Sequence, residues 1–259
     1  MAKTKKLKEH PEKGLFLLPG GYLTNDGECF REVEIRHLTG REEEMMADTD
    51  DETMLASLFD RILVNCVKRI GTLTKINLDV IKNLIVPDRD YLLLCLRRFT
   101  FGNRVEARLR CPNEQCNHMS DIGFDLDEIQ IQRNQGNGTF SAKLSSNTTY
   151  KDKTGAVYDA VQFRLPTAGD QEEAVSIMQN ENQSKALTYL FTKCIQKIGK
   201  IEKIDEDFVH SLPISTRREI ELQIKRHSPT VDLSINVTCP RCNYDFKSPF
   251  DIQNFFLTN

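Results

Sequence analysis

The chain has 259 residues, of which 39% are hydrophobic, and a formal net charge of −3. This length supports one large domain or two small ones with buried cores. The nearly balanced charge excludes a global basic field that would draw the protein to nucleic acid. No run of about 18 apolar residues occurs in the sequence, which excludes an ordinary membrane-spanning helix.

We predict that residues 1–21 form a basic N-terminal tail followed by a lead-in strand. The stretch MAKTKKLKEHPEKG is basic but lacks the apolar core of a secretory signal. We therefore expect a reducing cytosol, where the eight cysteines serve as core residues or metal ligands rather than as disulfides.

The next segment, residues 22–126, predicts strands, two helices and a strand that enters a cysteine turn. A glycine turn and the alternation over 29–35 indicate paired strands. Apolar residues at i, i+3 and i+4 spacing over 55–70 predict a helix that Gly71 caps. A second helix is predicted over about 88–99, and a strand over 104–110.

Residues 127–149 are polar and rich in Gly, Asn and Ser, which predicts a linker. Residues 150–259 then repeat the earlier pattern. Alternation over 157–163 predicts strands, the stripe over 187–198 predicts a helix before Gly199, and a second helix covers about 215–227. A strand over 231–238 enters the second cysteine turn. The segment ends in an apolar aromatic tail, residues 253–259, which either packs on its own domain or docks a partner.

The two long segments match each other at a fixed offset of 128 residues. Cys66-Val67-Lys68-Arg69-Ile70-Gly71 corresponds in this register to Cys194-Ile195-Gln196-Lys197-Ile198-Gly199. A gap-free register of this length is typical of internal duplication. We therefore predict an α+β fold, in which two similar units from a tandem duplication form a pseudo-two-fold arrangement joined at a zinc-ribbon-like site.

The predicted metal site combines one cysteine pair from each unit. Cys111 and Cys116 have C-x4-C spacing, and Cys239 and Cys242 have C-x2-C spacing. Each pair alone leaves two positions of a tetrahedral Zn²⁺ empty, and His118 has only a tyrosine at its matching position. We expect all four thiolates to hold one structural zinc. The alternative is four reduced thiols that bind no metal. The cysteines within the predicted helices, Cys66, Cys95 and Cys194, are expected in the core.

Four stretches of the sequence resemble the T4-type baseplate hub and hub-assembly family of contractile-tailed phages and related contractile injection systems. They are LPGGYLTNDGECFREVEIRHLTGREEE, PDRDYLLLCLRRFTFGNRVEARLRCPNEQC, RLPTAGDQEE and TCPRCNYDFKSPFDIQNFF. The resemblance implies a role in building the baseplate hub, with the hub or other tail proteins as partners. It implies the host bacterial cytoplasm during assembly as the location, or else the virion baseplate. It offers no catalytic residues.

The sequence leaves three functions to be compared. The first is a non-enzymatic structural or chaperone-like assembly protein. The second is a zinc-ribbon nucleic-acid-binding or regulatory protein, which the charge and the lack of aromatic residues interleaved with basic ones disfavour. The third is a zinc hydrolase, disfavoured because no His/carboxylate metal triad appears. We expect neither nucleic acid nor membrane as a partner, and the sequence leaves the oligomeric state open.

Overall fold

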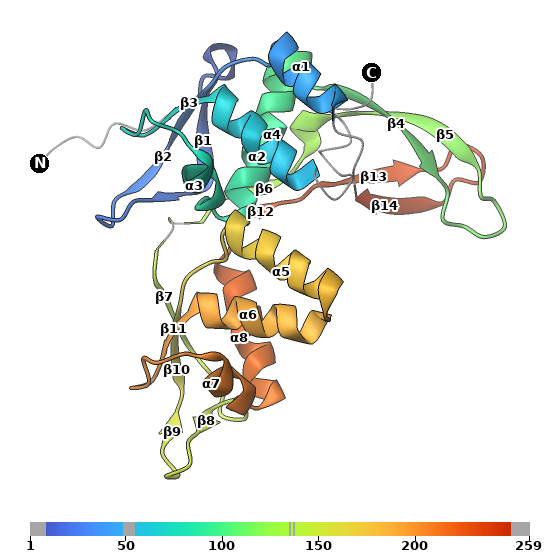
Figure 1. The fold of residues 1–259 in the computed structure, drawn as a ribbon. Helices are drawn as coiled ribbons and strands as arrows, with labels where there is room; N and C mark the ends of the chain where they lie inside the picture. The colour runs from blue at the N-terminus through green and yellow to red at the C-terminus, as the bar shows by residue number, and fades with distance from the viewer. Residues whose placement is uncertain (1–8, 49–54, 135, 137, 250–259) are drawn as a thin grey trace, which may run out of the picture.

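The computed structural model describes residues 9–48, 55–134, 136 and 138–249. The chain forms two α+β lobes, with two hairpins that extend beside the first lobe (Figure 1). The aromatic tail at residues 253–259 lies outside the described residues, so its expected role stays a prediction.

The first lobe packs helices on a three-stranded antiparallel sheet whose middle strand is β2. Its elements are β1 (Leu15–Leu23), β2 (Cys29–Ile35), α1 (Gly40–Ala47), α2 (Leu55–Cys66), β3 (Val67–Ile70), α3 (Leu78–Lys82) and α4 (Val86–Phe101). A short 3-10 helix, η1 (Pro11–Lys13), precedes them. Fully buried aliphatic residues of α2 and α4 form the centre of this lobe's core.

The second lobe has the same kind of sheet, with β10 in the middle. Its elements are β7 (Phe140–Lys143), β8 (Tyr150–Lys151), β9 (Val157–Tyr158), β10 (Ala160–Phe163), α5 (Ala168–Asn180), α6 (Gln183–Cys194), β11 (Ile195–Ile198), α7 (Glu206–Ser211) and α8 (Ile214–His227). Within 127–149, which the sequence suggested as a linker, β7 pairs with β10. The sheet of this lobe therefore begins before residue 150.

One hairpin follows the last helix of each lobe. The first consists of β4 (Arg104–Arg110) and β5 (Met119–Asp125), and the second of β13 (Ser234–Thr238) and β14 (Asp245–Pro249). After the first hairpin come η3 (Leu126–Glu128) and β6 (Ile131–Gln132), which pairs with β12 (Thr230–Val231). The second hairpin does not stay with its own lobe, because Ile235 and Val237 are buried in the core of the first.

The predicted helices over 55–70 and 187–198 are wrong at their C-terminal ends. They end at Cys66 and Cys194, and the next four residues of each form a strand beside β2 or β10. Both strands bury only their first and last residues. Two apolar residues three positions apart fit either a continued helix or this short strand. Only the backbone hydrogen bonds to a neighbouring strand of the sheet distinguish the two structures. Gly71 (φ 55°) therefore follows a strand and does not cap a helix.

Residues 128 positions apart make matching contacts in the two sheets. Val33 pairs with Ile70 in the first lobe, and Val161 pairs with Ile198 in the second. The Arg36 N–H donates to the Cys66 carbonyl at 2.9 Å, and the Arg164 N–H donates to the Cys194 carbonyl at the same distance. The two sheets are thus built to the same local plan.

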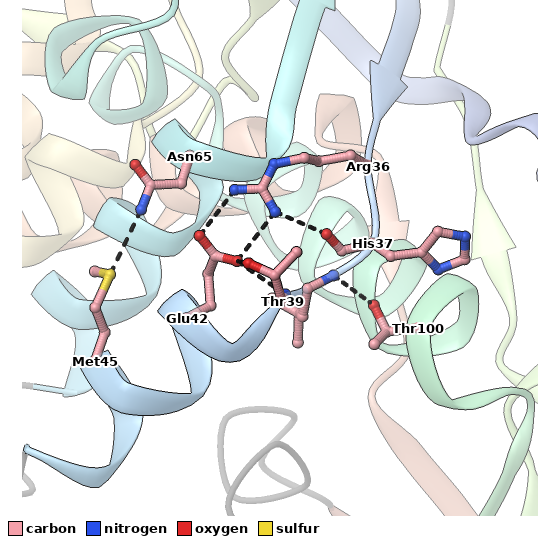
Figure 2. A network of polar contacts seen from close by, with 8 residues as sticks. Arg36, His37, Thr39, Glu42, Met45, Asn65 and Thr100 are labelled. Carbon is pink, nitrogen blue, oxygen red and sulfur yellow. Dashed lines mark hydrogen bonds and ion pairs between the residues drawn. The ribbon is translucent and has the colours of Figure 1, made fainter.

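Each lobe also fixes the start of one helix to its sheet through an ion pair whose carboxylate is buried. Arg36 donates two hydrogen bonds to Glu42, at 2.8 and 3.0 Å, and Thr39 donates its backbone N–H and its hydroxyl to the same carboxylate (Figure 2). The hydrogen bonds from Arg36 lower the pKa of the fully buried Glu42 to about 2. Arg164 and Asp170 repeat the pair at 2.6 and 3.1 Å.

The expected pseudo-two-fold arrangement does not describe how the lobe bodies contact each other. Residues 84–86 of the first lobe lie along residues 166–168 of the second, with the Ala168 N–H donating to the Leu84 carbonyl at 2.8 Å. Lys82 and Glu172 form an ion pair beside this contact, at 2.6 Å. A two-fold axis would repeat the contact between 212–214 and 38–40, but those residues lie far from each other, at α7 and α1 (Figure 1). The contact therefore uses a different surface of each lobe.

Candidate metal centre

Each cysteine turn closes a hairpin in the same way. The Cys111 N–H donates to the His118 carbonyl at 2.9 Å, and the Cys239 N–H donates to the Tyr244 carbonyl at 3.0 Å. The residue after the second cysteine is Asn117 in one turn and Asn243 in the other, with φ angles of 47° and 55°. Asparagine adopts this left-handed conformation more readily than most residues. These backbones turn the thiols of the two hairpins toward each other.

The structure brings all four predicted cysteines together. The sulfur atoms of Cys111, Cys116, Cys239 and Cys242 lie within 4.8 Å of one another. The pairs across the two hairpins are reciprocal: Cys111 Sγ is 3.7 Å from Cys242 Sγ, and Cys116 Sγ is 3.9 Å from Cys239 Sγ. Since Cys111 corresponds to Cys239 and Cys116 to Cys242, a local two-fold relation holds at this site.

These distances fit a metal ion held by four thiolates. With metal–sulfur bonds of about 2.3 Å, the sulfurs of a tetrahedral zinc site lie about 3.8 Å apart. A disulfide requires sulfurs at about 2.05 Å, and all four cysteines are free thiols. Thiolates are soft ligands that favour zinc, Cu(I) or iron–sulfur clusters over magnesium or calcium. The cluster can therefore hold a metal ion, and the donor set narrows its class.

The thiols of the cluster must ionise before they bind a metal ion, and their surroundings oppose or assist that step. Burial raises the pKa of Cys111 to about 12. Burial opposes ionisation of Cys239 as well, but hydrogen bonds from the backbone N–H groups of Cys242 and Arg241 lower its pKa to about 7. Four thiolates at these separations repel one another, and a divalent cation removes that repulsion.

Among the residues that the structure describes, this is the one group of three or more potential metal ligands whose donor atoms converge. The histidine next to the first turn, His118, is not part of it. Cys66, Cys95 and Cys194 are buried in the cores as predicted, and burial raises the pKa of each to about 12. Cys29 is exposed.

The sequence did not reveal where the second cysteine turn would pack. It lies on the first lobe because Ile235 and Val237 of β13 alternate with exposed residues and enter that lobe's core. The alternation was visible as a strand pattern, but the sequence does not state which lobe receives its apolar face. Both hairpins therefore pack on the first lobe, and their four cysteines meet there instead of at a boundary between the two lobes.

Comparison with known proteins identifies the family. No helix of the described residues is long and apolar enough to cross a membrane. Searches of curated proteins and of solved structures gave no match. The profile of a family described as "T4 bacteriophage base plate protein" matches residues 22–257, which include all four clustered cysteines, the second lobe and the first lobe from the end of β1 onward. The chain therefore belongs to the T4 bacteriophage base plate protein family.

Proposed function

We propose that this chain is a non-enzymatic structural or assembly protein of the baseplate hub in a contractile phage tail or a related injection system. The family match over residues 22–257 carries the proposal. Its partners are the hub or other tail proteins, which it meets in the cytoplasm of the host bacterium. The described residues form two lobes, each with a hydrophobic core, and a four-cysteine cluster whose closed donor set suits a structural protein better than a metal-dependent hydrolase.

We propose further that the cluster holds one structural Zn²⁺ through Cys111, Cys116, Cys239 and Cys242. Two observations support zinc: the cross-hairpin sulfur distances and the four-thiolate donor set. Thiolates at all four tetrahedral positions leave none for water, so the ion has a structural role. Bound zinc couples its binding free energy, on the order of 10 kcal/mol, to the folded arrangement of the two hairpins.

We propose that the lobes arose by tandem duplication, with units at about 22–126 and 150–259 and the shorter segment 127–149 between them. The matching strand registers and the two arginine–carboxylate pairs, each 128 residues apart, support this origin. The β7 strand at Phe140–Lys143 supports a second unit whose sheet starts slightly earlier.

Complementation tests the hub role. Host cells are infected with a phage whose gene for this protein is disrupted, and the chain is supplied from a plasmid. We expect electron microscopy to show contractile tails with the wild-type chain and none with an empty plasmid. Mass spectrometry of the purified particles then distinguishes a permanent subunit from an assembly factor. Normal tails with the empty plasmid would exclude the proposed role.

The metal proposal has its own readout. Protein purified without chelator should contain about one equivalent of zinc by elemental analysis, and Cys239→Ser should lose it. Cys29→Ser is the matched control, because Cys29 is exposed and lies outside the cluster. Iron or copper in the wild-type protein, or zinc retained by Cys239→Ser, would contradict the assignment.

A further inference from the structure

The contact between the lobes uses a segment of the first lobe and a groove of the second. Within the described residues, the matching segment of the second lobe and the matching groove of the first have no such partner. In the contact, the segment 84–86 places Ile85 against the start of α5, and Ile85 is 1% exposed within the core of the second lobe. The Ala168 N–H donates to the Leu84 carbonyl at 2.8 Å, and the Val86 N–H donates to the Pro166 carbonyl at 3.4 Å. A segment of one lobe thus fills a groove of the other.

Among the residues that the structure describes, none fills the matching groove of the first lobe. It lies between the start of α1 and the end of α4, where Leu38, Gly40 and Phe101 help to line a cavity of about 260 Å³. Gly40 is exposed, whereas its counterpart Ala168 is fully buried by the segment that docks there. Phe101 is 49% exposed at the edge of the cavity.

The matching segment of the second lobe is exposed. Residues 212–214 connect α7 to α8, as 84–86 connect α3 to α4, and Ile214 is 70% exposed. Pro213 takes the place of Ile85. The filled contact uses the carbonyl of the residue before Ile85 and the N–H of the residue after it, so a proline in the middle loses no hydrogen bond.

We propose that this chain binds a second copy of itself head to tail, with residues 212–214 of one copy in the α1 groove of the next. The proposal rests on the internal duplication proposed above. The groove lies at the start of α1 and the segment lies where α7 meets α8. These places are at opposite ends of the molecule, so the two cannot meet within one chain (Figure 1). Such a heterologous contact links copies in an open series instead of closing on itself as a two-fold dimer does.

Two further positions bear on the fit. The Lys82–Glu172 ion pair beside the filled groove corresponds to His210 and Glu44 in the open one. Arg41 stands where the second lobe has Gly169, and a Cβ at Gly169 would lie 3.3 Å from Lys82 Cβ. The docked segment must therefore shift by a few tenths of an ångström, which makes the contact between copies looser than the contact between lobes.

Size-exclusion chromatography with light scattering tests the proposal on full-length protein. The mass of the wild-type protein should rise above that of one chain as its concentration increases. Gly40→Glu should block the groove without disturbing the fold, because a Cβ at Gly40 meets no atom of the described residues within 4 Å. Ile214→Asp should disable the docking segment. Both place an acid in the first turn of a helix, where it is favourable. Val157→Asp, at an exposed position on β9, is the control and should associate like the wild type.

A mixture of the two variants identifies the head-to-tail mode. Each variant alone should have the mass of one chain. The Gly40→Glu chain keeps its segment and the Ile214→Asp chain keeps its groove, so an equal mixture should reach twice that mass and no more. A wild-type protein that stays monomeric, a variant that still associates alone, or a mixture that stays monomeric would each overturn the proposal. Circular dichroism and zinc content verify folding, and Ile214→Ser replaces Ile214→Asp if the latter unfolds. These outcomes leave the complementation result for the hub role unaffected.

Discussion

Substitution of the buried carboxylate in the first lobe should cost stability in a pH-dependent way. Glu42 is fully buried and accepts two hydrogen bonds from Arg36 and two from Thr39, and its pKa falls from 4.5 to about 2. Each tenfold change in proton affinity corresponds to about 1.4 kcal/mol, so this change represents about 3 kcal/mol of folding free energy at neutral pH. Arg36 is 31% exposed, and solvent screening makes this an upper figure.

We therefore expect Glu42→Gln to lose about 2–3 kcal/mol of unfolding free energy at pH 7. The folded pKa lies below the unfolded one, so the contribution of Glu42 is complete above pH 4.5. It is lost as the pH falls toward 2. The difference between the wild type and the variant should accordingly narrow below pH 4.5. Urea denaturation at several pH values measures both effects, because any loss of a bound metal at low pH affects the wild type and the variant alike.

Glu44→Gln is the matched control, because it removes an exposed carboxylate from the same helix. It should change the unfolding free energy by less than about 0.5 kcal/mol. Two results would refute the reasoning for Glu42. One is a loss below 1 kcal/mol at pH 7, and the other is a difference between the wild type and Glu42→Gln that stays constant from pH 7 to pH 3.

Three further predictions follow from the same structure. Asp170→Asn should destabilise the second lobe, because Arg164 and Thr167 hold the pKa of Asp170 below 3.8 against the effect of burial; urea denaturation should show the loss shrinking as the pH falls below that value. Gly199→Ala should cost more than about 1 kcal/mol in thermal unfolding, because φ is 57° and the new Cβ would lie 2.1 Å from Tyr158 Cδ1, whereas Gly40→Ala should be nearly neutral; equal effects would contradict this. If the cysteine cluster holds the proposed zinc, its removal by a chelator should lower the melting temperature and re-addition should restore it; an unchanged melting curve after complete removal would argue against a structural role.

The cysteine cluster was predictable from the sequence because its signal is local and chemical. Two short turns with paired cysteines specify ligand type and spacing, and the tetrahedral requirement joins them. The strands after Cys66 and Cys194 were not predictable in the same way. Their apolar residues are three apart, a spacing that helices and these short strands share, and the sheet partner that decides between them lies over thirty residues away in the sequence.

The roles of buried polar residues could not be predicted from the sequence. Glu42 reads as one of three consecutive surface glutamates, yet it is the one that is fully buried. Asp88 likewise reads as an acid in the first turn of a helix. It is buried and accepts hydrogen bonds from the Gly20 and Gly21 N–H groups, both at 2.7 Å, which ties α4 to β1. Such roles depend on partners that only the fold brings together. Neither the composition nor the periodicity of the sequence therefore predicts these roles.

The packing of the second hairpin on the first lobe has a consequence for protein synthesis. A ribosome completes α1 to α4 and the first cysteine turn long before it adds Ile235, Val237, Cys239 and Cys242, which finish the core and the cluster. The entire second lobe is translated in the interval. A nascent chain that stops within this interval has two thiols of the cluster and an incomplete apolar core. A metal ion held by all four cysteines would therefore mark a chain that has been translated at least as far as Cys242.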